Sequence, residues 1–133
     1  MGAQENKTWL RRIYERLDTG DLGVIEEAWD PNFVGYWPGQ KLHGQQGYRD
    51  MISASQAGLP DAKHNFEIMM AADDMVAAHG MITGTHRGEL FGKAPTGKKV
   101  EFTSTAIWRI RSGKIVEIWC DFDLAGLMAQ LSC

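Results

Sequence analysis

The spacing of the hydrophobic residues changes near residue 60, and this change constrains the fold more than any other feature. Apolar residues first recur at helical spacing, and we expect helices over 9–17, 22–29 and 45–57 with a short strand at 33–37. Polar and apolar residues then alternate, which predicts strands over 64–70, 75–86, 100–111 and 114–122, and a closing helix over 124–131. Helices followed by antiparallel strands indicate an α+β fold, with a curved sheet wrapped around the helices.

Composition limits the kinds of partner that this chain can bind. Its 133 residues fit one domain, 1–133, and 44% of them are hydrophobic, enough for a core and an apolar cavity. The net charge of −3 comes without a basic block, which argues against nucleic acid as a partner. No apolar run reaches the length of a membrane span, so we expect no membrane partner. Cys120 and Cys133 do not form a disulfide framework, and we therefore expect a reduced, cytoplasmic setting.

Strand alternation predicts which side chains face the interior. We expect the inward faces to carry Val76, Ala78, Gly80, Ile82, Gly84 and His86, then Phe102, Ser104, Ala106, Trp108 and Ile110, then Val116, Ile118, Cys120 and Phe122. Tyr14, Tyr36 and Trp37 are expected to join them from the N-terminal half. A mostly apolar pocket with few polar groups suits a small hydrophobic molecule that has a polar handle.

Several motifs in the last third of the chain resemble one known family. They are Gly84-Thr85-His86-Arg87-Gly88, Gly113-Lys114-Ile115-Val116-Glu117 and Asp123-Leu124-Ala125-Gly126-Leu127. The chain thereby resembles the SnoaL-like polyketide cyclases, within the nuclear-transport-factor-2-like superfamily. This resemblance implies a cone-shaped α+β barrel, in which a curved, mostly antiparallel sheet packs on N-terminal helices around a deep apolar pocket. It also implies ring closure by an intramolecular aldol reaction without a metal.

The residues that such cyclases use for chemistry are replaced here. The resemblance places the family's acid–base aspartate at Cys120, its assisting histidine at Ala106 and the adjoining glutamine at Ser104. A thiol in an apolar cavity is mostly protonated at neutral pH and is a poor base. Two hypotheses therefore stay open. One is a cofactor-free cyclase or isomerase acting on a polyketide- or terpenoid-like compound, and the other is a ligand-binding module without turnover. A third, epoxide hydrolysis or ketosteroid isomerisation, needs carboxylates that the predicted inward faces lack.

His86 and Asp123 are the catalytic candidates. His86 either contacts the ligand or braces the glycine-rich loop that follows, and Asp123 either assists it or caps the closing helix. The ligand-pocket candidates are Tyr14, Tyr36, Trp37, Ser104, Ala106, Trp108 and Cys120. Tyr14 either donates to an oxyanion or belongs to the core. His64 and His79 have no neighbouring partner in the sequence, and we assign them no role.

Three further patterns bear on ligands and partners. Residues 92–99 approach a phosphate-binding loop, but Lys99 replaces the required Ser or Thr and a strand follows instead of a helix. No group of His, Cys or carboxylate residues has metal-ligand spacing, so we predict neither metal nor cofactor. Ile107, Ile115 and Trp119 are expected on the outer face of the sheet, where an apolar patch predicts a homodimer.

Overall fold

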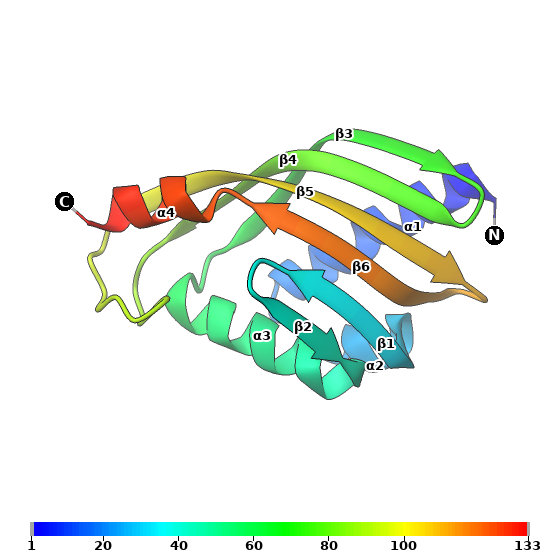
Figure 1. Cartoon of the computed structure of the whole chain (residues 1–133), viewed down its shortest axis with the longest axis horizontal. Helices are drawn as coiled ribbons and strands as arrows, with labels where there is room; N and C mark the ends of the chain where they lie inside the picture. The colour runs from blue at the N-terminus through cyan, green and yellow to red at the C-terminus, as the bar shows by residue number, and fades with distance from the viewer. Residues whose placement is uncertain (1, 133) are drawn as a thin grey trace.

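The computed structural model describes residues 2–132, so Cys133 lies outside the described residues. Its helices are α1 (Ala3–Asp18), α2 (Val24–Ala28), α3 (Gly44–Gly58) and α4 (Leu124–Leu131). Its strands are β1 (Trp29–Trp37), β2 (Gln40–His43), β3 (Lys63–Ala72), β4 (Met75–Thr85), β5 (Lys99–Arg111) and β6 (Lys114–Phe122). The predicted α+β class is confirmed, because helices pack on a curved six-stranded sheet (Figure 1).

The sheet has the order β2-β1-β6-β5-β4-β3. Neighbouring strands are antiparallel except for β1 and β6, which run parallel and pair Gly35 with Ile118. β1 begins at Trp29 and continues through Pro31, earlier than the strand expected at 33–37, and β2 was not predicted. β2 has four residues, of which only Leu42 is buried, so hydrophobic periodicity gives little signal for it.

The helices cover one face of the sheet and build two apolar clusters. The main cluster joins α1, α2 and α3 to the sheet, with Leu10, Leu17, Trp29 and Phe33 fully buried. A second cluster lies between α4 and the far ends of the strands, and is built from Leu59, Leu90, Val100, Phe102, Leu127 and Leu131. Within residues 2–132, none of the helices combines the length and the apolar character that crossing a membrane requires.

Two β-bulges change the predicted strand faces. In β3 the register shifts between Phe66 and Ile68, so Ile68 turns outward and is 55% exposed, whereas Met69 packs against the core. In the β5–β6 pair the register shifts beyond Arg109, and Ile115 becomes fully buried. The prediction that Ile115 lies on the outer face is therefore wrong, because one extra residue in a strand inverts the alternation.

Candidate active site

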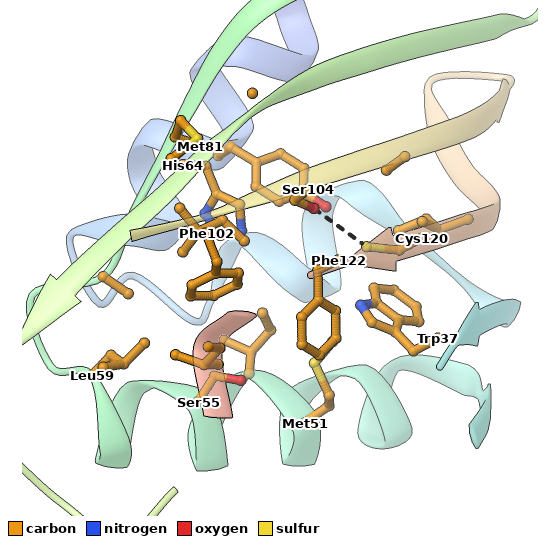
Figure 2. A pocket seen from close by; sticks show the side chains of 18 of the residues that line it. Trp37, Met51, Ser55, Leu59, His64, Met81, Phe102, Ser104, Cys120 and Phe122 are labelled. Carbon is orange, nitrogen blue, oxygen red and sulfur yellow. Dashed lines mark hydrogen bonds between the residues drawn. The ribbon is translucent and has the colours of Figure 1, made fainter. Parts of the chain in front are cut away.

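A cavity of about 390 Å³ opens between α3 and the concave face of the sheet. Met51 and Ser55 of α3 and Leu59, which follows the helix, form one side, and side chains of the sheet form the other (Figure 2). Most of the lining is aromatic or aliphatic, and the volume is typical of small-molecule sites. The polar residues among the lining side chains are Tyr14, Gln40, Tyr48, Ser55, His64, Asn65, Glu89, Ser104 and Cys120.

The sheet wall of this cavity carries the three positions that the sequence resemblance singled out. Ser104, Ala106 and Cys120 all line the cavity, on the neighbouring strands β5 and β6. The Ser104 hydroxyl and the Cys120 thiol lie 3.7 Å apart, a weak hydrogen bond (Figure 2). Burial raises the pKa of the Cys120 thiol to about 11, so the thiol is protonated at neutral pH. These three positions therefore offer weak donors and no strong base.

A polar cluster lies where α1 and α3 meet the sheet. The Trp108 Nε1–H donates to the Tyr14 hydroxyl over 3.0 Å, and the hydroxyls of Tyr14 and Tyr48 are 3.1 Å apart. All three side chains are buried and all three line the cavity. Burial raises the pKa of both tyrosines far above the usual range, which keeps both hydroxyls protonated.

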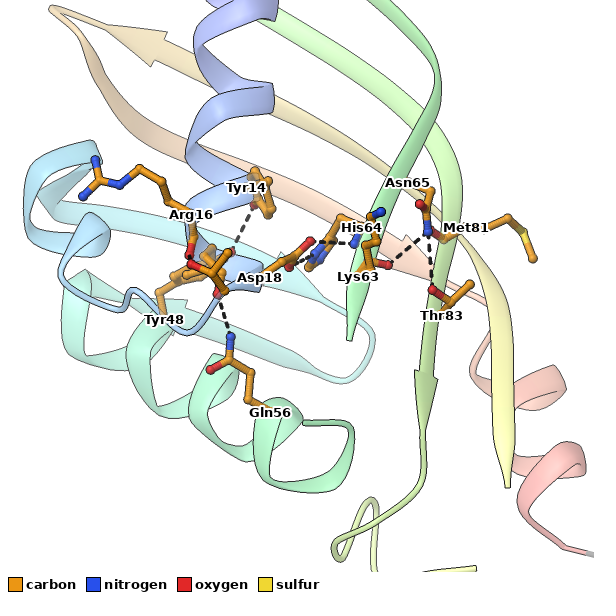
Figure 3. A network of polar contacts seen from close by, with 12 residues as sticks. Tyr14, Arg16, Asp18, Tyr48, Gln56, Lys63, His64, Asn65, Met81 and Thr83 are labelled. Carbon is orange, nitrogen blue, oxygen red and sulfur yellow. Dashed lines mark hydrogen bonds and ion pairs between the residues drawn. The ribbon is translucent and has the colours of Figure 1, made fainter. Parts of the chain in front are cut away.

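His64 lines the cavity beside this cluster, and Asp18 orients it. His64 Nδ1 is 2.7 Å from Asp18 Oδ1, and the His64 backbone N–H donates to Asp18 Oδ2 over 2.7 Å (Figure 3). A carboxylate oxygen accepts hydrogen bonds, so the contact assigns the donor role to Nδ1, and in the neutral ring the lone pair is on Nε2. The imidazole ring also packs edge-on against Tyr14, with ring centroids 4.9 Å apart. This arrangement has the form of a base held in one tautomer by a carboxylate.

The two residues predicted to be catalytic do not line the cavity. His86 is fully buried, its Nδ1 accepts from the Thr96 backbone N–H, and its backbone bonds to Gly97 and Lys98. Asp123 is exposed and caps α4 by accepting from the Gly126 backbone N–H over 2.9 Å. These contacts favour structural roles for both residues, and their catalytic roles stay predictions.

The remaining candidates divide between the cavity and the outer surface. Trp37 and Trp108 line the cavity together with Tyr14, whereas Tyr36 lies outside the lining, is 37% exposed and stacks on Trp119. The Asp18–His64 pair was not predicted from the sequence, because its partners are 46 residues apart and only the meeting of α1 with β3 joins them. Alternation did place His64 and Phe66 on one face of a strand, which was the available signal.

Comparisons with known proteins agree with this geometry. The family model for SnoaL-like polyketide cyclases matches residues 7–131. IdmH from Streptomyces antibioticus, a candidate polyketide cyclase, is 28% identical with a TM-score of 0.84, over 96% of this chain and 98% of its own. AclR from Streptomyces galilaeus, a candidate hydroxylase, is 26% identical with a TM-score of 0.88, over 98% of this chain and 82% of its own.

A third structure shows the same fold at lower identity. A candidate SnoaL-like polyketide cyclase from a Jannaschia species is 20% identical with a TM-score of 0.91, over 98% of this chain and 94% of its own. Among curated proteins, no significant match to the chain was found. Within residues 2–132, no three His, Cys, Asp or Glu side chains cluster as a metal site would require.

Proposed function

Since the chain belongs to the SnoaL-like polyketide cyclase family, we propose that it catalyses cyclisation or isomerisation of a small hydrophobic keto compound with its own acid–base side chains. The observation that carries this proposal is the Asp18–His64 pair at the cavity wall. The cavity is apolar enough to take a polyketide- or terpenoid-like skeleton. The proposal therefore names a class of substrate, a hydrophobic ketone, and not one compound.

In the proposed reaction His64 is the general base. Its Nε2 takes a proton from the carbon next to a carbonyl group, and Asp18 stabilises the imidazolium that forms. The enolate carbon then attacks a second carbonyl of the same molecule, which forms a C–C bond. The resulting alkoxide takes the proton back from His64, so the product is an isomer of the substrate. Isomerisation differs only in returning the proton to another carbon.

Proton exchange tests this proposal with model ketones in place of the natural substrate. The protein is incubated in D2O with a panel of aryl ketones and linear polyketones, and deuterium incorporation beside the carbonyl is followed by NMR and mass spectrometry. We expect His64→Ala to lower the exchange rate by about 10²- to 10⁴-fold, the usual contribution of a general base. Asp18→Asn is expected to lower it too, because the amide can favour the wrong tautomer of His64.

His79→Ala is the matched control, because His79 is exposed and bonds to Thr105 outside the cavity. Equal exchange by His64→Ala and the unchanged protein would show that His64 is not the base. Retention of ketones without exchange or new products would favour the second candidate, a ligand-binding module. That alternative is supported by the protonated thiol at Cys120, the position at which the sequence resemblance places the family's aspartate.

We also propose that the protein is a cytoplasmic homodimer joined through the outer sheet face. Trp119 stacks on Tyr36 there, Arg109 lies over its indole ring at 5.5 Å, and Ile107 is 38% exposed. Trp119→Glu would replace the apolar ring in that interface by a charge that loses its hydration on association, and it is expected to give monomers by sedimentation velocity. An unchanged dimer, or a monomeric parent protein, would contradict this part of the proposal.

A further inference from the structure

The polar cluster of Tyr14, Tyr48 and Trp108 holds more hydrogen-bond donors than it uses. The indole N–H of Trp108 donates to the Tyr14 oxygen, and one tyrosine hydroxyl donates to the other. The two tyrosines carry two O–H protons between them, and only one of these is engaged in their mutual bond. Among the described residues, no other hydrogen bond to either hydroxyl is found, so one O–H remains without a protein acceptor.

A spare donor is costly when it is this deeply buried. Tyr14 and Tyr48 are 4% and 1% exposed, yet both line the cavity. A buried donor without a partner loses its hydration and gains nothing in return, which destabilises the folded protein. An acceptor that enters the cavity would satisfy it, so the cluster is prepared for a ligand that brings an oxygen atom.

We propose that the Tyr14–Tyr48 pair binds the carbonyl oxygen of the ligand through its spare O–H. The Trp108 N–H occupies one lone pair of Tyr14, which polarises the hydroxyl pair and strengthens the bond that it donates. The Tyr14 ring is in edge contact with His64, and on that ground we place the carbon next to the held carbonyl at the proposed base. This last step rests on the proposed function, whereas binding of the oxygen does not.

The charge of the cavity narrows the ligand class further. The side chains that line the described cavity include no Lys or Arg, so a ligand carboxylate would have no full cationic partner there. Burial keeps both tyrosines protonated, because it raises the pKa of each, and they therefore remain donors across the working pH range. The expected ligand is a neutral ketone or ester, and an enolate is the charged form that the pair would stabilise during a reaction.

A matched ligand pair tests this assignment by binding alone. 2-Acetylnaphthalene and 2-isopropylnaphthalene have nearly the same shape, and only the first has a carbonyl oxygen. Their affinities are measured by calorimetry for the parent protein, Tyr14→Phe, Tyr48→Phe and the double variant. We expect the double variant to lower the affinity for the ketone, relative to the hydrocarbon, roughly tenfold, the effect of one lost buried hydrogen bond. Each single variant leaves one O–H free and is expected to lower it less.

Tyr36→Phe is the matched control, since Tyr36 is exposed on β1 and does not line the cavity. The hydrocarbon affinity reports whether each variant keeps a folded cavity. A second readout is the infrared stretch of a ¹³C-labelled carbonyl, which shifts to lower frequency when it accepts a hydrogen bond and returns toward its value in hydrocarbon in the double variant.

An unchanged affinity ratio and an unchanged carbonyl frequency in the double variant would overturn the assignment. The binding measurement involves no turnover, so it stands apart from the test of His64. Loss of the affinity ratio without proton exchange in the parent protein would support the oxygen site and refute the catalytic proposal. Proton exchange with an unchanged affinity ratio would do the reverse.

Discussion

Two parts of the cavity wall differ in what their polar groups can do. On β5 and β6, called the sheet wall below, the positions to which the sequence resemblance assigns the family's acid–base residues hold Ser104, Ala106 and a protonated Cys120. At the edge strand β3 of the same sheet, where α1 and α3 meet it, the buried tyrosine pair lies beside the Asp18–His64 pair. If His64 is the base, as we propose, family membership locates the cavity but not the part of its wall that carries the chemistry. Variants on each wall test this contrast.

Placing the family's aspartate back on the sheet wall is expected to have the largest effect on stability. Burial raises the pKa of the Cys120 thiol to about 11, and the same desolvation acting on a carboxylate would cost about 3 kcal/mol at pH 7. Burial would raise the pKa of the new aspartate in the folded protein. The free energy of unfolding of Cys120→Asp is therefore unaffected by this charge below the pKa of the unfolded chain, where the carboxyl group is protonated in both states. It falls as the pH rises through the folded-state pKa. Urea unfolding at pH 4 and pH 7 measures this loss, relative to the parent protein.

Cys120→Asn is the control for Cys120→Asp, because its amide does not titrate. A loss that is the same at both pH values would show that shape, and not charge, limits this position. A gain of ring-closing activity by Cys120→Asp would instead show that the sheet wall can still perform the family's reaction.

The rate of alkylation of Cys120 measures how reactive the thiol on the sheet wall is. In a Cys133→Ser background Cys120 is the only cysteine, and iodoacetamide reacts with thiolates. With a pKa of about 11, Cys120 is expected to react at pH 8 roughly a hundredfold more slowly than an unperturbed thiol. The rate should rise with pH toward 11, and urea-unfolded protein supplies the fast reference. Rapid alkylation of the native protein at pH 8 would reveal a reactive thiol.

Gly80→Ala is expected to move β3 and so disturb the part of the cavity wall that carries His64. A Cβ atom at Gly80 would overlap the backbone carbonyl of Asn65, next to the bulge in β3. The atoms that this Cβ would meet are backbone atoms, which no side-chain rotation can move, so β3 has to shift. The free energy of unfolding is expected to fall by about 2 kcal/mol. Gly84→Ala is the matched control, since its Cβ would meet the Leu59 side chain at 3.1 Å. Equal losses in urea unfolding would show that β3 adjusts without strain.

Ser104→Ala is expected to have the smallest effect. The hydroxyl bonds only weakly to Cys120, at 3.7 Å, and its loss should slow α-proton exchange by roughly twofold. The measurement is the same deuterium exchange that tests His64. A hundredfold loss would invert the comparison and make the sheet wall the reactive one.

Much of the fold follows from the sequence, since long elements with strong periodicity are the easiest to predict. Alternation correctly predicts the inward faces of β5 and β6 at Ser104, Ala106, Trp108 and Cys120, which all line the cavity. It fails where a strand gains a residue, as at Ile115. Periodicity within one strand gives no information about a bulge that depends on the neighbouring strand.

The candidate site is less predictable than the fold. His64 has no partner nearby in the sequence, because Asp18 lies at the end of a helix in a separate part of the chain. For Tyr48 the sequence predicts a position in a helix but no contact with the cavity. The roles of both residues depend on how α1 and α3 are placed against the sheet. His86 is conspicuous in the sequence because of its glycine-rich motif, yet its described hydrogen bonds stabilise the loop that follows β4. A histidine in a glycine-rich motif can stabilise backbone as readily as it can bind a ligand.

During synthesis on the ribosome, β1 emerges long before β6, its parallel neighbour in the sheet. Val34 pairs with Glu117 and Gly35 with Ile118, so the edge of β1 that faces β6 has no partner strand while about eighty further residues are translated. An unpaired strand edge is prone to pair with other chains. Before β6 has been translated, the contact of β1 with α3 is available to the nascent chain, and it buries one face of β1 while leaving that edge unpaired.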